Sequence, residues 1–308
     1  MAIDPQAQRI LDLLVARGGP ALTSLPLPQV RAQEVIGPQR GPDMETQDVL
    51  VPGPGGQLLL RFYYPQSGEL PALVYFHRGG FALGSVAAAD DECRVLAQKS
   101  GCCVVSVAYR LAPEHKFPAA VLDAYTALSY VHENAGDHHI DYMRIAIGGS
   151  SAGANLATVA ARQAKERRGP TLSFQLLFYP VTDLRTFDTP SYREFAEGPV
   201  VTREEMAFFR DRYLPDEASR SDPAASPLSA TNLIGMPPAY VVTAELDALR
   251  DDGEMYAEAL TRAGTQVTLR RVPGVFHGFL SYFYAIDVAN EVFDEAAALL
   301  RQRFSMAG

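Results

Sequence analysis

The segment IAIGGSSAGANLATVAARQA (residues 145–164) joins an apolar run to a helix-like pattern through a cluster of glycine and serine. The run has the composition of a buried strand, and after Ala152 apolar residues return at three- and four-residue steps. Between them, residues 149–153 read G-x-S-x-G, centred on Ser151. A nucleophile on a tight strand-to-helix turn needs small residues two before and two after it, because the chain doubles back there. The segment therefore predicts a nucleophile elbow.

Glycine-rich strand-to-helix turns also bind phosphate groups, so the pentapeptide alone leaves two functions open. The segment lacks the G-K-[ST] of a P-loop and does not match G-x-G-x-x-G. Its order of strand, turn and helix favours the elbow.

Mostly continuous apolar runs recur along the chain, as expected for strands that are covered on both faces. They are residues 72–77, 102–109, 144–149, 174–179 and 239–244. Helical patterns lie at residues 90–99, 118–135, 152–166, 251–263 and 288–303. This alternation predicts an α/β fold with a mostly parallel, doubly covered sheet, and residues 48–65 read as a hairpin at an antiparallel edge.

Two segments interrupt the alternation, namely the N-terminal stretch to about residue 40 and residues 185–222. Ligands bind at the carboxyl ends of the strands in open α/β sheets, and insertions there commonly form a lid. We predict a helical cap made of residues 1–45 and 185–222. Residues 46–184 and 223–308 would then form the catalytic α/β domain.

A serine nucleophile needs a base and an acid that orients the base, in the chain order serine, acid, histidine for this architecture. His277, in VPGVFHGFL, is the one histidine after Ser151. A structural histidine is the alternative, but its place in a loop beside a glycine favours the base.

Four acidic residues are candidates for the acid of the triad. Asp247 lies just past the end of the apolar strand of residues 239–244, where the turn can direct its side chain toward His277. Asp251 and Asp252 suit the first turn of the next helix better, and Glu245 is the fourth candidate. We therefore assign the acid to Asp247.

Hydrolysis also requires N–H donors for the negative oxygen of the tetrahedral intermediate. The stretch YFHRGGF (residues 75–81) ends a strand with glycines that allow close backbone approach. Gly79 and Gly80 are the candidate donors, together with the N–H of Ala152 after the nucleophile. An ordinary Gly-Gly turn is the alternative.

Four ordered blocks resemble the hormone-sensitive-lipase-like (family IV) carboxylesterases of the α/β-hydrolase superfamily. YFHRGGFALG is similar to their H-G-G-G-[FW] block, VAYRLAPEHKFPAA to Y-R-L-A-P-E-x-x-F-P-A-A, and GGSSAGANLA to G-[DT]-S-A-G-[GA]-N-L-A. DALRDDG resembles D-P-L-R-D-[DE]-G, and HGF closes the set. The resemblance implies the α/β-hydrolase fold, the same triad and oxyanion residues, a cap, and neither a metal nor an organic cofactor.

The sequence departs from this pattern beside the site. Arg78 stands where the first glycine of H-G-G-G would be, and Ser150 replaces an acid or threonine. We expect His77, Arg78 and Ser150 to line the pocket or tune the loop. Three hypotheses apply to the arginine: it strains a positive-φ position, it attracts an anionic or carbonyl-rich substrate, or it turns away to pair with an acid such as Asp90 or Asp91 and has no effect on the site.

In YRLAPEHKFPAA, Arg110 and Glu114 are expected to position a strand end, and His115 is interpreted as structural. Cys93, Cys102 and Cys103 cannot all pair with one another, so we predict reduced, buried thiols.

The balance of 27 basic and 36 acidic residues gives a net charge of −9, which argues against an extended nucleic-acid surface and favours a small uncharged partner. The N-terminus lacks a signal-peptide pattern, and no apolar stretch reaches membrane-span length. We therefore expect a soluble, cytoplasmic protein that binds neither nucleic acid nor membrane.

The motifs predict a serine carboxylesterase that hydrolyses short- to medium-chain acyl esters through an acyl-enzyme intermediate. An amidase, lactonase or aryl-ester hydrolase would use the same triad. A non-catalytic receptor similar to plant gibberellin receptors is disfavoured, because those receptors lack the catalytic histidine. Dimerisation is common in the family, so we also consider a homodimer.

Overall fold

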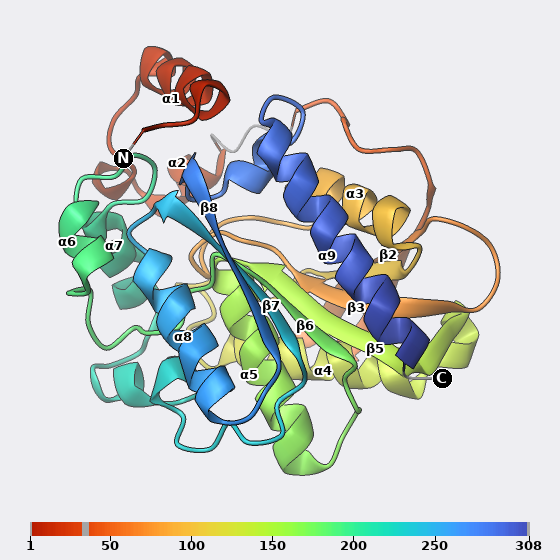
Figure 1. Ribbon diagram of the computed structural model, residues 1–308. Helices are drawn as coiled ribbons and strands as arrows, with labels where there is room; N and C mark the ends of the chain where they lie inside the picture. Colours follow the sequence, from red (N-terminus) through yellow and green to blue (C-terminus); the bar gives the residue numbers. More distant parts are fainter. Residues whose placement is uncertain (1, 33–36, 307–308) are drawn as a thin grey trace.

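The computed structural model describes residues 2–32 and 37–306, which form an eight-stranded sheet flanked by helices (Figure 1). The strand order is β1-β2-β4-β3-β5-β6-β7-β8. Neighbours from β4 to β8 are parallel, whereas β2 pairs antiparallel with both β1 and β4. The bounds are β1 (Glu45–Gly53), β2 (Gly56–Tyr64), β3 (Leu70–Phe76), β4 (Cys103–Val107), β5 (Ile140–Ser150), β6 (Phe174–Phe178), β7 (Ala239–Leu246) and β8 (Val267–Phe276).

Helices cover both faces of the sheet (Figure 1). On one face α3 (Asp90–Ser100) packs against α9 (Asp287–Met306). On the other face lie α4 (Ala119–Glu133), α5 (Ala152–Arg167) and α8 (Arg250–Arg262). Two apolar cores result, one on each side of the sheet, and this explains why the central strands are apolar at successive positions.

The predicted fold class is confirmed by this arrangement. The hairpin expected within residues 48–65 is formed by β1 and β2, and β1 is the antiparallel edge of the sheet. Strand β5 begins at Ile140, four residues before its predicted start, where Ile140 pairs with Leu70. No periodic pattern in the sequence predicts the short turns η2 (Ala135–His138), η3 (Ala218–Ser221), η4 (Pro227–Ser229) and η5 (Phe279–Tyr282).

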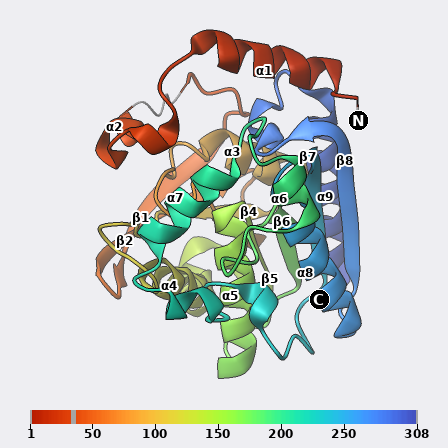
Figure 2. The same ribbon diagram turned by 90° about the vertical axis from the view of Figure 1, so that its left-hand side faces the viewer.

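The two segments predicted as cap meet beside the sheet. The first contributes α1 (Pro5–Arg17), η1 (Leu22–Ser24) and α2 (Leu27–Ala32), and the second α6 (Pro190–Glu194) and α7 (Arg203–Tyr213). Figure 2 shows α6 and α7 in front of the sheet with α1 above them, and α7 contacts η1. The division at residues 1–45, 46–184, 185–222 and 223–308 stays a prediction, and its residues 1, 33–36, 307 and 308 lie outside the described residues.

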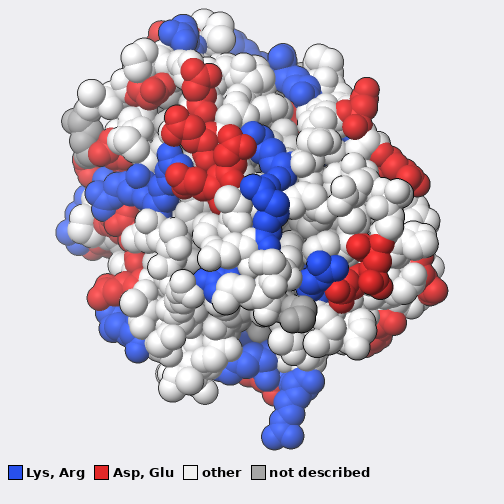
Figure 3. Space-filling model, turned by 45° about the vertical axis from the view of Figure 1, so that its right-hand side comes forward, with Lys and Arg blue, Asp and Glu red and all other residues white. Residues whose placement is uncertain are grey.

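Charged side chains of both signs are intermixed on the face shown in Figure 3. Several exposed charges are paired, as in the contacts of Lys99 with Asp294 and of Arg270 with Glu291. Within residues 2–32 and 37–306, no helix is both long and apolar enough to cross a membrane.

Arg110 and Asp123 connect the end of β4 to α4. Asp123, which is buried, accepts hydrogen bonds from the backbone N–H of Arg110 at 2.8 Å and from its Nε and Nη2 at 2.9 Å each. The guanidinium also donates to the carbonyl oxygen of Ala119. The scaffold position expected for Arg110 therefore has a specific partner on α4.

We expect Asp123→Ala to lower the free energy of unfolding by about 3 kcal/mol, because it leaves a largely buried guanidinium without its counter-charge. Urea unfolding measures the change. Glu258→Ala is the matched control, since the pair of Glu258 with Arg262 is about two-thirds exposed and its loss should cost under about 1 kcal/mol. Equal effects of the two substitutions would contradict the proposed anchoring.

Candidate active site

Ser151 lies on a sharp turn between β5 and α5, with φ 56° and ψ −119°. The turn brings the start of α5 against the end of β3. A Cβ atom on Gly153 would collide with the carbonyl oxygen of Phe76, and one on Gly149 would overlap the backbone of Gly153. Only glycine fits at these two positions, which is the steric requirement that G-x-S-x-G predicts.

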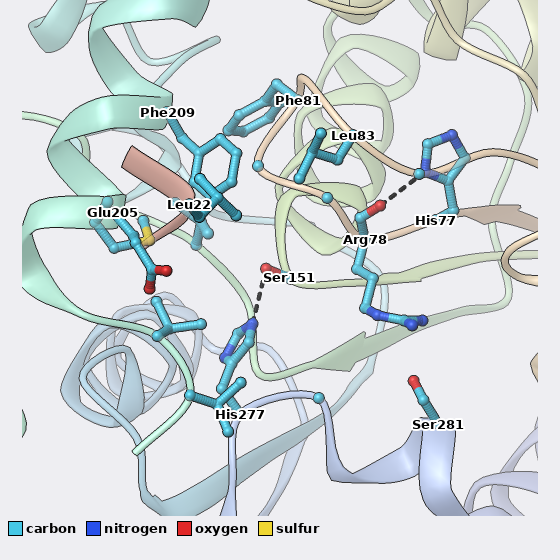
Figure 4. Close-up of a pocket in the computed structure, with 18 of the residues that line it drawn as sticks. Leu22, His77, Arg78, Phe81, Leu83, Ser151, Glu205, Phe209, His277 and Ser281 are labelled. Carbon is cyan, nitrogen blue, oxygen red and sulfur yellow. Dashed lines mark hydrogen bonds between the residues drawn. The ribbon is translucent and has the colours of Figure 1, made fainter. Parts of the chain in front are cut away.

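The side chains of Ser151, His277 and Asp247 form a hydrogen-bonded chain. His277 Nε2 lies 3.0 Å from Ser151 Oγ, and His277 Nδ1 lies 2.7 Å from Asp247 Oδ2. Figure 4 shows the imidazole directed at the serine hydroxyl. The other oxygen of Asp247 accepts from the backbone N–H of Leu249, and the ring of Tyr179 packs edge-on against the imidazole at 4.8 Å. All three members are buried, so solvent competes little for these bonds.

The other three acids have different partners. Glu245 accepts from the backbone N–H of Gly274, and Asp251 accepts from the backbone N–H of Ser191. Asp252 is buried in the first turn of α8, as expected from the sequence, and burial raises the pKa of its carboxyl. None of these three is bonded to His277 in the described residues.

The loop of residues 77–84 follows β3 and borders the triad. Its turn is closed by the N–H groups of Ala82 and Leu83, which both donate to the carbonyl oxygen of Gly79. Gly79 and Gly80 have φ of 133° and 58°, and a Cβ on Gly80 would enter the ring of Phe209. These glycines thus let the loop turn and let a residue of α7 pack on it.

His77 supports this loop from beneath. Its Nδ1 lies 2.8 Å from the carbonyl oxygen of Arg78, and its ring stacks on Tyr109 at 4.2 Å. Burial lowers the pKa of His77 to about 4, so its ring is neutral at pH 7 and donates through Nδ1. The structure thus places His77 as a support of the loop.

Arg78 does not fulfil the strain hypothesis, because its φ is not among the positive values of the described residues. Its side chain turns aside to pair with an acid, as in the third hypothesis, but the acid is Glu92 and neither of the two examples, Asp90 and Asp91. Nη1 donates to Oε1 of Glu92 at 2.8 Å. Asp90 instead pairs with Arg94, and the 90–100 helix turns Glu92 inward toward the loop.

Ser150 and Ala152 flank the nucleophile position. Ser150 is fully buried, and its hydroxyl has no hydrogen-bond partner within the described residues. Ala152 is also fully buried at the first position of α5, next to Ser151. Ser150 is therefore not a wall of the pocket, whereas Arg78 and His77 are.

A cavity of about 320 Å³ opens above Ser151. Figure 4 shows Leu22 and Phe209 on the side opposite His277, so both predicted cap segments contribute to it. Its charged walls are Arg78, Glu205 and Arg210, and the carboxylate of Glu205 accepts from the backbone N–H of Thr202. The apolar walls are Leu22, Phe81, Leu83, Ala88, Val181, Leu184, Val200, Val201, Met206 and Phe209.

Sequence reasoning missed Arg31 of α2. It makes a two-pronged ion pair with Glu114 at 2.8 and 2.9 Å and donates to the carbonyl oxygens of Ala82 and Ala112. Arg31 thus links α2 both to Glu114 and to the 77–84 loop. No local signal links residues 83 positions apart, so the pair could not be found from spacing.

The three cysteines are free and buried, as predicted. Burial raises the pKa of the Cys102 thiol to about 12, which disfavours its thiolate. Within the described part of the chain, no group of three or more His, Cys, Asp and Glu side chains is arranged to hold a metal ion.

A serine, an acid and a histidine in this chain order, at the carboxyl ends of β5, β7 and β8, define the site class of the α/β hydrolases. A family model of the alpha/beta hydrolase fold matches residues 73–281. The chain belongs to this family.

Comparison with known proteins gives relatives at moderate identity. Carboxylic ester hydrolase LipN of Mycobacterium tuberculosis is 42% identical over 247 residues, which are 78% of this chain and 65% of LipN, so this chain spans just under two thirds of that protein. Carboxylesterase NlhH of the same species is 36% identical, covering 97% of this chain and 96% of NlhH. The solved structure of a hyperthermophilic esterase from Pyrobaculum calidifontis is 38% identical, with a TM-score of 0.93 over the full length of both chains. The predicted family resemblance is confirmed.

We expect Gly153→Ala to lower the free energy of unfolding by at least about 2 kcal/mol, because the added methyl group overlaps backbone atoms that cannot move independently. Thermal or urea unfolding tests this. Gly136→Ala is the control, since a Cβ there meets no atom within 4 Å and its effect should stay within about 0.5 kcal/mol. A Gly153→Ala protein as stable as the control would refute the steric argument.

Between about pH 6.5 and 4, His77 should make the fold less stable as the pH falls. The unfolded histidine takes up a proton near its usual pKa, whereas the buried ring stays neutral until about pH 4. The contribution reaches about 3 kcal/mol at pH 4, relative to pH 7. Urea unfolding of the parent and of His77→Asn, whose amide can replace the Nδ1–H donor, should show a stability difference that changes by this amount. Shifts at other groups occur in both proteins and cancel, so a pH-independent difference would contradict the assignment.

Proposed function

We propose that the protein is a serine carboxylesterase in which Ser151 is the nucleophile, His277 the base and Asp247 the acid. The coarser assignment, an ester hydrolase, follows from the family to which the chain belongs. The observation that supports the finer one is the hydrogen-bonded chain from Ser151 through His277 to Asp247 at the floor of a cavity.

In the proposed reaction, Ser151 Oγ attacks the ester carbonyl carbon while His277 Nε2 accepts the hydroxyl proton. Asp247 holds the Nδ1–H tautomer, so that Nε2 is free to accept, and stabilises the imidazolium that forms. The imidazolium then donates its proton to the departing alkoxide, which leaves as an alcohol. Water, deprotonated by the same imidazole, attacks the acyl-enzyme and releases the carboxylic acid.

The negative oxygen of each tetrahedral intermediate is assigned to the N–H groups of Gly79, Gly80 and Ala152. Gly79 and Gly80 border the cavity beside Ser151, and Ala152 directly follows the nucleophile. N–H donors held by a closed turn and a helix start are oriented before the substrate arrives, which is the condition for effective stabilisation of the intermediate.

The cavity supports esters of short to medium acyl chains. Its volume of about 320 Å³ is at the lower end of ligand-sized pockets. Its walls are mainly apolar side chains from the segments that follow β3 and β6 and from residues 22 and 200–209. In this proposal residues 1–45 and 185–222 act as a cap that limits chain length and excludes water from the acyl-enzyme.

We expect hydrolysis of p-nitrophenyl esters to be fastest for acetate to octanoate and to fall for palmitate. Ser151→Ala should lower kcat/KM by at least about 1000-fold, because the nucleophile is lost. Ser305→Ala, an exposed residue near the end of α9, is the control for the handling of variants. Labelling with a p-nitrophenyl phosphonate, followed by peptide mass spectrometry, should modify Ser151 alone.

The rival activities give different results in the same assay set. Ethyl esters, a γ-lactone and a p-nitroanilide are measured beside the aryl esters. Faster turnover of the anilide or the lactone would replace the esterase assignment by an amidase or a lactonase, and activity on aryl esters alone by an aryl-ester hydrolase. Activity that survives Ser151→Ala would overturn the proposed nucleophile.

A further inference from the structure

A carboxylate is buried directly behind the 77–84 loop, outside the triad. Glu92 lies in the first turn of α3, and its side chain is only 3% exposed. It accepts three hydrogen bonds, from Arg78 Nη1 at 2.8 Å, from the Ser281 hydroxyl at 2.7 Å and from the Tyr75 hydroxyl at 3.0 Å. A buried carboxylate is retained only when it is this fully partnered.

The three donors come from three different parts of the active-site frame. Tyr75 is on β3, just before the 77–84 loop, and Arg78 is within the loop. Ser281 is in η5, four residues after His277. Glu92 therefore connects the loop that carries the candidate oxyanion donors to the segment that carries the base, and Figure 4 shows the Arg78 side chain extending past Ser151 toward Ser281.

Arg78 supplies the only positive charge bonded to Glu92 within the described residues. The side chain of Arg78 is 35% exposed, whereas that of Glu92 is almost fully buried. The two groups are thus unequal: a lone arginine here can be solvated, but a lone Glu92 would be a buried charge with only two neutral donors. Loss of Arg78 alone would therefore leave Glu92 as a buried charge without a counter-charge, so the two residues depend on one another.

The surroundings of the pair extend to the triad. Burial and the charge of Glu92 raise the pKa of the Tyr179 phenol, and the charge of Arg78 opposes this rise. The same ring packs against His277 at 4.8 Å. The Tyr179 ring therefore links the Arg78–Glu92 pair to the surroundings of His277.

We infer that Arg78 and Glu92 are positioning residues, whose ion pair holds the 77–84 loop and the His277 segment in the relative placement that the reaction needs. This inference rests on the proposed function and deepens it. In a chain with glycine at position 78, the loop would have no side chain with which to reach α3. In this protein the Arg78 side chain connects the loop to α3. Glu92 supplies the negative charge that balances the arginine beside the site.

The test is a double-substitution cycle with Arg78→Gly, Glu92→Leu and the combined variant, measured as kcat and KM on p-nitrophenyl butyrate. Each single variant should lose about 10- to 100-fold in kcat with little change in KM, since a displacement of about 1 Å at reacting groups costs about that much. The combined variant should lose about as much kcat as one single variant, because either substitution alone already removes the ion pair. Additive losses in the combined variant would overturn the inference.

Two conservative variants keep the test valid if Arg78→Gly fails to fold. Glu92→Gln keeps an acceptor for Tyr75 and Ser281 and leaves an arginine that water can reach, so it should fold and lose about tenfold in kcat. Arg78→Lys keeps the charge and should retain more than half of the parental kcat. Parental kcat in Glu92→Gln would overturn the positioning role.

A binding measurement separates positioning from general stability. A trifluoromethyl ketone forms a tetrahedral adduct with the serine, so its affinity should fall in the single variants in parallel with kcat, whereas a ground-state ketone of the same shape should bind unchanged. Arg262→Ala with Glu258→Ala, an exposed Arg–Glu pair, should show no coupling in either measurement.

Two further outcomes would contradict either the positioning inference or the proposed function, and the measurements distinguish them. If Arg78→Gly raises KM for a succinate half-ester but leaves the butyrate unaffected, the arginine binds an anionic substrate and the positioning inference is wrong. If parental activity does not depend on Ser151, the proposed function fails instead, whatever the cycle shows.

Discussion

The structure depends on one close approach, between the start of α5 and the end of β3. Gly153 packs on the carbonyl oxygen of Phe76 at a distance that excludes any side chain, and this contact forces the turn on which Ser151 is presented with φ 56°. Because β3 and β5 are also paired side by side, the same contact places the 77–84 loop next to the nucleophile position. The geometry of the site is thus a consequence of backbone packing, and Asp247 and His277 are added from the ends of β7 and β8.

This constraint explains what the sequence could predict. The elbow, the candidate base and the candidate acid are specified by short local patterns and by chain order. The sequence alone therefore predicts Ser151, His277 and Asp247, which the structure brings into one hydrogen-bonded chain. Patterns of strand and helix were also sufficient for the sheet, because both of its faces are buried and its central strands are uniformly apolar.

The contacts that the sequence could not predict are ion pairs between distant segments. The sequence marks Arg78 as unusual and predicts an acid partner such as Asp90 or Asp91, but periodicity alone does not determine which of three successive acids at a helix start points inward. Glu92 is the one directed at the loop, whereas Asp91 accepts from backbone N–H groups of residues 40 and 41. The contact of Arg31 with Glu114 had no local signal, since it joins two segments that meet only after folding.

The two ion pairs connect the same loop to two different helices, α2 and α3. Arg31 reaches it from α2 through the carbonyl oxygen of Ala82, and Glu92 reaches it from α3 through Arg78. A glycine-containing loop gains its needed close approach at the expense of rigidity, because glycine has more conformational freedom in the unfolded and partly folded states than any other residue. Side-chain anchors at both ends of such a loop restore rigidity without placing a Cβ atom near the substrate. The loop can therefore combine small residues at the reacting centre with charged, partnered residues one layer behind it, and one of these charged residues, Arg78, stands where the family motif has glycine.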